Sequence, residues 1–504
     1  MRVIQRYRIE LGIVAANIAL LMLLLPQGAM GFDDWGYLTS PTVPNSLMYT
    51  RLYDTMFHMI VKAAPWLFPW LNHVVIVIGH TISAVMFYLI ASSRLGIKKA
   101  LSFVFAVVFT FYAGTFSSVA NTDTLNNVLP LMFTVLGIYL YGRVDSDAKK
   151  ITVFISMSIL AIFGKESGVA ALALIPAFFI TDMLRGTKDI RYSKKLFFSL
   201  CVAGFIILCV YVTFFYFTQI RTGAFGFVKD ESSPGAHYLI AFLNNTLNAY
   251  TPATNLLNVQ YAILGYDINV PAWEFALVAA TLFCGIFTVI TGFLACKEKS
   301  IALVLFALGI IAIIPYIPRG APSEMYSYMA SWFALLLIAY LCNNMNKRLL
   351  AVCLGLFIAA NVFSWSWRYI ITTESTRIGK QITAYFIEQL EDKNIPNNPR
   401  LLYYALNSDR RKVDWYSFSP SYYHLNGVVL NSALGWNAEI NSVYLFNETG
   451  YWSIDQLMQN VEYHYDLSDA DLLQYAKDKI TISREQGMHD IAVILMGDGT
   501  LYVY

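Results

Sequence analysis

Two adjacent carboxylates, Asp33 and Asp34, follow the first long apolar run of the chain and precede Trp35 and Tyr37. Like charges placed side by side raise one of the two pKa values, and such a carboxylate is suited to take a proton from a nucleophile. The pair is therefore a candidate general base. A solvated loop pair, or a cap on the next helix, is the alternative that the dipeptide leaves open.

A second charged pair, Lys165-Glu166, separates two short apolar runs, 151–163 and 168–181. Ionisable residues between membrane segments are candidates for function because burying their charge is costly. The lysine could bind a lipid phosphate. A plain interfacial turn is the alternative.

A third polar joint supplies a guanidinium, a carboxylate and two phenols, from Arg319, Glu324, Tyr326 and Tyr328. A guanidinium can bind phosphate through two parallel hydrogen bonds. Two further cations, one acid and one imidazole are isolated candidates: Arg51, Arg221, Asp123 and His80. The sequence has no Walker loop, HExxH or CxxC motif, and all six cysteines lie in or beside apolar runs. No disulfide framework or metal site can be read from these cysteines, no cofactor is expected, and the sequence leaves the need for a metal open.

Composition indicates the kind of protein that positions these residues. Of 504 residues, 57% are hydrophobic and 13% are charged, whereas a soluble domain has about 25% charged residues. This composition excludes a single soluble globular domain and intrinsic disorder. The net charge of +2 produces no overall basic field, so nucleic acid is not an expected partner.

Eleven apolar runs are candidate membrane-spanning helices, each of which needs about 20 mostly apolar residues. They are 9–26, 71–92, 99–113, 126–142, 151–163, 168–181, 196–218, 275–296, 300–317, 327–342 and 348–366. The first run, which basic residues precede, could instead be a signal peptide.

Lysine and arginine are enriched in cytoplasmic loops. With the N-terminus inside, the inside joints hold 18 of these residues and the outside joints hold six. Treating 151–181 as one long helix would put the basic joint 182–195 outside, against this rule. We therefore expect eleven spans, a cytoplasmic N-terminus and an outside tail.

A domain boundary is expected near Trp367–Arg368, because long apolar runs stop there. Residues 1–367 would form the membrane module, with large outside loops at 27–70 and 219–274. Residues 368–504 carry 11 basic and 17 acidic residues. Their pattern predicts a helix over 374–392, strands over 401–406, 443–446 and 491–496, and a last strand over 501–504, as in a small α/β domain.

The order of these motifs resembles the integral-membrane GT-C glycosyltransferases, especially the branch of the protein O-mannosyltransferases. That branch carries an Asp-Asp or Asp-Glu pair in its first outside loop and a Lys-Glu between the fifth and sixth spans, as Asp33-Asp34 and Lys165-Glu166 do here. The weaker matches are Tyr49-Thr-Arg51-Leu52, Asn72, His80, Asp123 and Glu324-Met-Tyr-Ser-Tyr328, with Arg319 near the place of a family arginine. The resemblance covers about 330 residues, and the tail matches nothing in the family.

The resemblance implies a polyprenyl-phosphate-sugar-dependent enzyme of the cytoplasmic membrane that modifies a surface glycan, as bacterial serotype-modifying enzymes modify O-antigen. It implies that Asp33 is the base, that Asp34 supports it, and that the reaction inverts the sugar. The donor phosphate would bind near Lys165 and Arg319, with Arg51 and Arg221 as further candidates. Side chains for sugar or acceptor binding would be Tyr37, His80, Asp123, Glu166, Glu324, Tyr326 and Tyr328. The expected binding partners are the polyprenyl-phosphate-linked sugar, a glycan acceptor and membrane lipid. A polyprenyl-phosphate glycosyltransferase and a flippase would be functional partners.

Three other functions remain open from the sequence. A surface-glycan polymerase or ligase also uses lipid-phosphate donors. A transporter or flippase of lipid-linked sugars would favour paired repeats and polar residues at mid-span, and neither is visible. A membrane sensor whose tail binds a ligand is the third.

Overall fold

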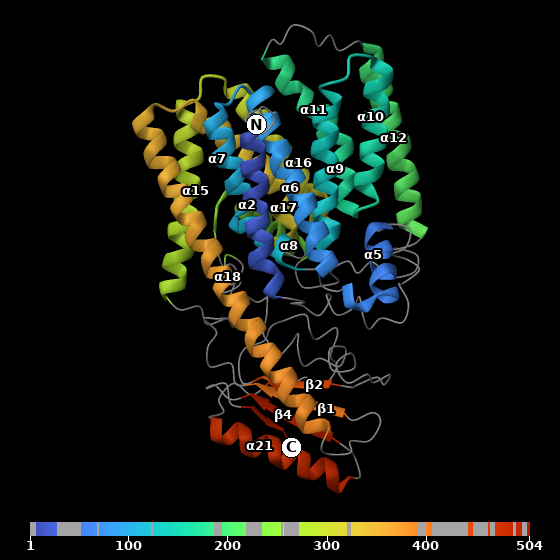
Figure 1. Ribbon diagram of the computed structural model, residues 1–504, viewed down its shortest axis with the longest axis vertical. Helices are drawn as coiled ribbons and strands as arrows, with labels where there is room; N and C mark the ends of the chain where they lie inside the picture. Colours follow the sequence, from blue (N-terminus) through green and yellow to red (C-terminus); the bar gives the residue numbers. More distant parts are fainter. Residues whose placement is uncertain are drawn as a thin grey trace. The chain divides into compact units, whose positions relative to one another are not determined.

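The computed structural model describes residues 7–27, 52–67, 70–121, 124–185, 194–217, 234–253, 256, 272–319, 324–391, 400–405, 442–446, 462–463, 469–486, 490–495 and 501–503. The described residues are helical up to residue 391 and include a small sheet beyond it (Figure 1). The chain divides into two compact units, and the last boundary between them along the sequence falls between Arg368 and Tyr369.

Each of the eleven predicted apolar runs contains a helix. Helices are expected there, because a backbone in lipid must satisfy its own hydrogen bonds. The helices are α2 (Arg8–Leu24), α6 (Trp70–Ser93), α7 (Lys99–Thr110), α9 (Leu125–Tyr141), α10 (Asp147–Ile162), α11 (Ala171–Leu184), α12 (Lys194–Phe215), α15 (Ala272–Ala295), α16 (Lys299–Ile313), α17 (Tyr328–Asn343) and α18 (Lys347–Glu391). Shorter elements at the helix ends and between the helices are η1 (Leu25–Gln27), α5 (Leu52–Ala63), η2 (Pro65–Leu67), η3 (Ala113–Thr115), α8 (Phe116–Ala120), η5 (Glu166–Ala170), α13 (Pro234–Tyr250), η7 (Ile314–Arg319) and η8 (Glu324–Ser327).

Within the described residues, seven helices are long and apolar enough to cross a membrane, and a bent pair makes up to eight. The shorter predicted spans correspond to α2 and α9, with 17 residues each, and α10, with 16. The protein therefore belongs to the polytopic all-α class, and the count of eleven spans stays a prediction.

Helix α17 is the centre of the first unit, because its whole apolar window is buried, whereas α12 is almost entirely exposed. Trp332 of α17 donates a hydrogen bond to the Ser83 carbonyl of α6 at 3.0 Å and packs edge-on against Phe87 at 5.4 Å. Because lipid tails are as apolar as the helix surfaces, helices in a membrane associate through such close packing and polar contacts rather than through the hydrophobic effect.

The predicted span 99–113 is broken. Helix α7 ends at Thr110, and α8 follows after a bend of 45°. Asn361 of α18 stabilises the break, because its amide accepts from Ala113 N at 3.0 Å and donates to the Phe111 carbonyl at 2.9 Å. Residues 114–120, which follow the predicted span 99–113, are buried. Irregular backbone at membrane depth requires such partners.

Helix α13 lies within the predicted outside segment 219–274. Its C-terminal part is buried and packs against α15, α16 and α17. The Tyr250 hydroxyl donates to the Phe306 carbonyl of α16 at 2.8 Å, and the Tyr112 hydroxyl donates to the Ala249 carbonyl at 3.1 Å. A Cβ at Gly309 would overlap the Tyr250 hydroxyl, so a glycine is needed for this approach.

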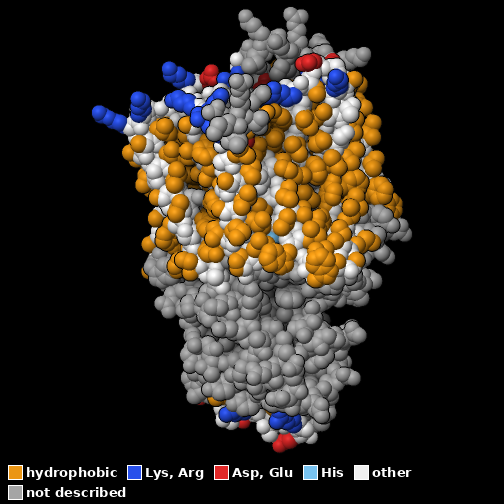
Figure 2. Space-filling model, viewed as in Figure 1, with side chains coloured by type: hydrophobic (Ala, Val, Ile, Leu, Met, Phe, Trp, Pro, Cys, Tyr) orange, Lys and Arg blue, Asp and Glu red, His pale blue; other side chains and the backbone are white. Residues whose placement is uncertain are grey.

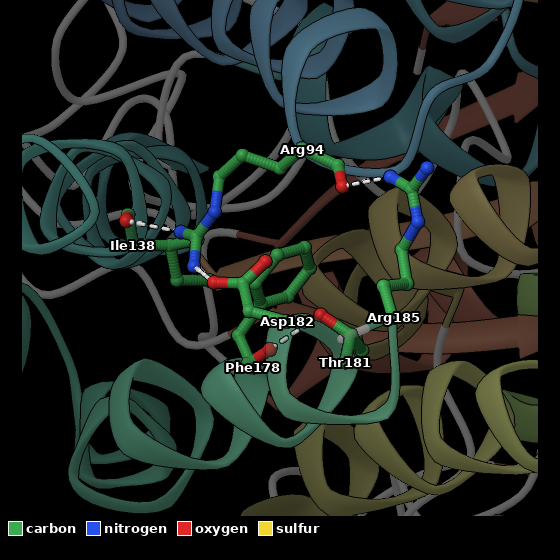
Figure 3. Close-up of polar contacts among 6 residues, drawn as sticks. All are labelled: Arg94, Ile138, Phe178, Thr181, Asp182 and Arg185. Atoms are coloured by element: carbon green, nitrogen blue, oxygen red, sulfur yellow. Dashed lines mark hydrogen bonds and ion pairs between the residues drawn. The ribbon is translucent and has the colours of Figure 1, made fainter. Parts of the chain in front are cut away.

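Basic side chains gather at one end of the helical unit, above a face covered by apolar side chains (Figure 2). At the ends of α6, α9 and α11, Arg94 pairs with Asp182 and donates to the Ile138 carbonyl at 2.8 Å (Figure 3). Arg185 donates to the Arg94 carbonyl. The pair is largely buried, so it joins three helix ends that are far apart in sequence.

The C-terminal part of the second unit, from Tyr369 onward, begins within α18, because the predicted span 348–366 and the predicted helix 374–392 are one continuous helix. No proline or glycine lies between residues 356 and 378 to interrupt it. The described strands are β1 (Arg400–Ala405), β2 (Ser442–Phe446), β3 (Glu462–Tyr463), β4 (Asp490–Leu495) and β5 (Leu501–Val503). They form one sheet in the order β3-β2-β1-β4-β5, parallel except for β4–β5, and α21 (Asp469–Glu485) packs against β4. The predicted strands 401–406, 443–446, 491–496 and 501–504 overlap β1, β2, β4 and β5.

Candidate functional site

Lys165 is the best-defined charged residue of the candidate site. Its side chain is buried, with a relative exposure of 6%. The ammonium Nζ donates to Asn127 Oδ1 at 2.7 Å and to Asn126 Oδ1 at 3.3 Å. These two contacts fix the position of the ammonium.

Two tyrosine rings stand beside the same ammonium. Tyr316 of η7 and Tyr326 of η8 stack with ring centroids 4.6 Å apart and planes at 14°. Lys165 Nζ lies 5.9 Å from the first centroid and 5.3 Å from the second. Cations are attracted to the faces of aromatic rings at this range. The cation is therefore positioned by four side chains from three separate parts of the sequence.

The break between α10 and α11 places Lys165 there. Helix α10 ends at Ile162 and α11 begins at Ala171, so the chain does not run as one long helix. Gly168 makes this turn possible, because a Cβ would overlap the Ala161 carbonyl. A Cβ at Gly164 would lie 2.8 Å from the Pro130 ring of α9. Small residues thus let the turn sit close to α9, which carries Asn126 and Asn127.

The start of α5 is tied to the same turn. Leu52, the residue after Arg51, donates its backbone N–H to the Phe163 carbonyl at 2.9 Å. Tyr53 stacks on Phe133 of α9 with centroids 5.7 Å apart. Through this contact the backbone next to Arg51 meets Phe163, which precedes Lys165 by two residues in the sequence.

Element η8 is held by the broken helix. Ser327 Oγ donates to the Gly114 carbonyl at 3.0 Å, and Ser118 Oγ donates to the Met325 carbonyl at 3.3 Å. These bonds flank Tyr326 on both sides in sequence. The break at α7–α8 thus positions the ring that faces Lys165.

His80 and Tyr328 form a separate, fully buried pair. His80 Nε2 lies 3.4 Å from the Thr110 carbonyl, and Nδ1 lies 2.7 Å from the Tyr328 hydroxyl. A carbonyl can only accept, so Nε2 carries the proton and Nδ1 accepts from the hydroxyl. The pair joins α6 to the first residue of α17, directly after η8.

The other predicted site residues are described in part or fall beyond the described ranges. Glu166 is half-buried at the start of η5. Arg319 ends η7 and Glu324 begins η8, so their backbones belong to the elements of Tyr316 and Tyr326, while their side chains are not described. Six predicted site residues lie outside the described residues: Asp33, Asp34, Tyr37, Arg51, Asp123 and Arg221.

Sequence reasoning missed Asn126, Asn127 and Tyr316. The available signal was an amide pair at the start of an apolar run, where polar side chains need partners. Among the described residues, no three His, Cys, Asp or Glu side chains come together as a metal site, and none of the six cysteines is in a disulfide. Cys201 and Cys209 are exposed on α12 rather than packed in a core.

The similarity of this chain to known proteins is limited. No protein-family model and no curated protein matches it. Among solved structures, it is similar to an oligosaccharyltransferase of Archaeoglobus fulgidus, crystallised with zinc and sulfate, at a TM-score of 0.39 and 13% identity. The match covers 84% of this chain and 61% of the archaeal chain, so this chain spans less than two thirds of its length. A score of this size establishes neither a shared fold nor a shared activity.

Proposed function

We propose that this protein is a GT-C-type glycosyltransferase that moves a sugar from a polyprenyl-phosphate donor to a surface glycan, such as O-antigen, on the outer side of the cytoplasmic membrane. The observation that carries the proposal is the buried Lys165 ammonium, held by two amide oxygens and two aromatic faces at the end of apolar helices. A fixed cation there suits the phosphate of a membrane-embedded donor.

The chemistry needs such a cation. When an acceptor hydroxyl attacks the anomeric carbon, the bond from that carbon to the phosphate oxygen breaks and negative charge grows on the leaving phosphate. A cation that is already held in position in a partly dehydrated site stabilises this charge more strongly than water does. Lys165 is already oriented, so no reorganisation of its side chain is required.

The remaining roles follow from the family resemblance. Asp33 accepts the proton of the attacking hydroxyl, the sugar is transferred with inversion, and Asp34 orients Asp33 or the acceptor. Arg319, Arg51 and Arg221 are the further candidates for the phosphate. The backbone bond between Leu52 and Phe163 supports Arg51, because it brings the neighbouring residue to the turn of Lys165.

Turnover of purified full-length protein with a polyprenyl-phosphate sugar and a glycan acceptor tests the proposal. We expect Lys165→Ala to lower kcat by about 10²–10³-fold and Asp33→Asn by about 10²–10⁴-fold. Lys165→Arg, which keeps the charge, should retain more activity than Lys165→Ala. The matched control is Lys149→Ala, which removes an exposed lysine at the other end of α10. Wild-type turnover in Lys165→Ala, at saturating and limiting donor, would remove Lys165 from the phosphate site.

A further inference from the structure

Helix α13 carries a group of buried amides that the proposed phosphate site does not use. Asn244, Asn245 and Asn248 each have no exposed surface. Residues three and four apart share one face of a helix, so the three amides lie on a common face. No charged residue and no histidine occurs between residues 238 and 253. The buried end of α13 itself therefore carries amides and no charge, and the buried Arg368 guanidinium donates to the Ala253 carbonyl just beyond it at 3.4 Å.

In two of these amides, Asn244 and Asn248, some polar atoms meet no hydrogen-bond partner among the described residues. Asn244 Nδ2 makes a long contact of 3.5 Å to Asn245 Oδ1. Asn244 Oδ1, and both Oδ1 and Nδ2 of Asn248, meet no partner among the residues that the structure describes. Buried polar atoms are paired in the great majority of cases, because leaving them unpaired costs stability. A further group that both donates and accepts is needed to complete this face.

We infer that Asn244 and Asn248 form a sugar-binding subsite that recognises hydroxyl groups of the donor's sugar; this inference rests on the proposed function. A sugar hydroxyl donates one hydrogen bond and accepts others, as an amide does. Within the proposed donor, the sugar is the part that matches.

The amide face of α13 and Lys165 are connected through contacts with η7 and η8. Helix α13 packs against η7 and η8, which carry Tyr316 and Tyr326. A Cβ at Gly114 would overlap the Asn248 carbonyl, and the Gly114 carbonyl accepts from Ser327, next to Tyr326. Tyr326 in turn faces the Lys165 ammonium. A donor whose phosphate meets Lys165 therefore has η8 between its charged group and the amides of α13.

Binding measurements on purified full-length protein test this assignment. The probes are bare polyprenyl phosphate and its glucose, galactose and mannose conjugates. We expect one conjugate to bind wild-type protein about tenfold more tightly than the bare lipid, the size of one to two hydrogen bonds. Asn248→Leu, which keeps the side-chain size but removes its polar atoms, should abolish that difference and leave the Kd of the bare lipid unchanged. Asn244→Leu should reduce the difference.

The controls separate this inference from its premise. Asn17→Leu removes a buried amide of α2 whose Nδ2 donates to the Ile13 carbonyl and to Thr110 Oγ1, and it should leave the selectivity unchanged because α2 is not part of the proposed subsite. If Asn248→Leu does not fold, Asn248→Ala is measured in its place with the same expectation. The inference is overturned if no conjugate binds more tightly than the bare lipid, or if the Asn248 variant weakens both equally, as a purely structural water site would. Absence of binding to every probe, including the bare lipid, overturns the proposed function as well.

Discussion

At the scale of single residues, the burial of Lys165 is the decisive feature. An ammonium that merely reaches the interface would be exposed and flexible, as long charged side chains near helix ends commonly are. Lys165 is instead 6% exposed and bonded to both amides of an adjacent pair. Burying a charge in this way is costly. A cation held in place in this way is suited to bind an anion at this turn.

The two amide contacts of Lys165 lead to a graded prediction. Asn127→Leu should lower kcat about tenfold, because it removes the shorter hydrogen bond, 2.7 Å, to a charged group. Asn126→Leu should have a smaller effect, because its contact is 3.3 Å. Steady-state kinetics with varied donor would check this order. Equal activity in both variants and wild type would mean that the amides do not position the cation.

At the scale of elements, the site is built where helices are interrupted. The turn between α10 and α11 holds Lys165, the break between α7 and α8 holds η8, and α13 ends inside the bundle. Non-helical backbone at membrane depth is tolerated only within protein or beside a water-filled cavity. Interruptions that meet at one place are therefore a structural sign of a functional site.

The turn that holds Lys165 depends on Gly168. Gly168→Ala would force a Cβ into the Ala161 carbonyl, and overpacking of this kind costs about 1–3 kcal/mol. We expect a lower unfolding temperature and loss of donor binding. Gly355→Ala is the matched control, because nothing lies within 4 Å of its new Cβ. Thermal unfolding in detergent, followed for both variants, would contradict the role of the turn if the two curves coincide.

The junction of α6, α9 and α11 gives a second prediction about elements. Arg94→Ala removes the guanidinium that pairs with the buried Asp182, and breaking a buried ion pair destabilises by about 3–5 kcal/mol. Arg94→Lys should rescue only in part, because it loses the planar guanidinium that also reaches the Ile138 carbonyl. Thermal unfolding would measure both, with exposed Lys347→Ala as the control. An unchanged unfolding temperature in Arg94→Ala would show that this junction contributes little.

At the scale of the whole molecule, charge and hydropathy divide the chain. The helical unit shows an apolar face with basic side chains gathered at one end (Figure 2). Cytoplasmic loops are enriched in lysine and arginine, so we predict that this end faces the cytoplasm. The turn of Lys165 follows the end of α10 opposite to Lys149 and Lys150, which supports an outer location for the site.

The orientation can be measured with reporter fusions. A reporter enzyme that is active only outside the cytoplasm, fused after Tyr504, should be active, because eleven spans starting inside put the tail outside. A second fusion in the basic joint 182–195 should be inactive. Activity of only the opposite type of reporter at Tyr504 would require one predicted span to be merged or removed.

Hydropathy and the spacing of apolar residues predict the helices of the apolar runs and the strand segments of the tail. All eleven apolar runs contain helices, because any backbone in lipid must close its hydrogen bonds locally. The break around Lys165 was also predicted, since the count of basic residues required two helices there. These properties depend on residues that are neighbours in sequence, so a sequence can reveal them.

Only the tertiary structure decided which polar side chains meet. Lys165 is bonded to amides 38 and 39 residues away, and Ser327 to a carbonyl 213 residues away. Neither partner is marked by local periodicity, and the insertion of α13 into the bundle depends on a glycine in α16 that leaves room for Tyr250. Close packing between distant segments sets these contacts. For this reason the sequence could suggest Lys165 as a cation of the site, but not Asn126, Asn127, Tyr316 or the amides of α13.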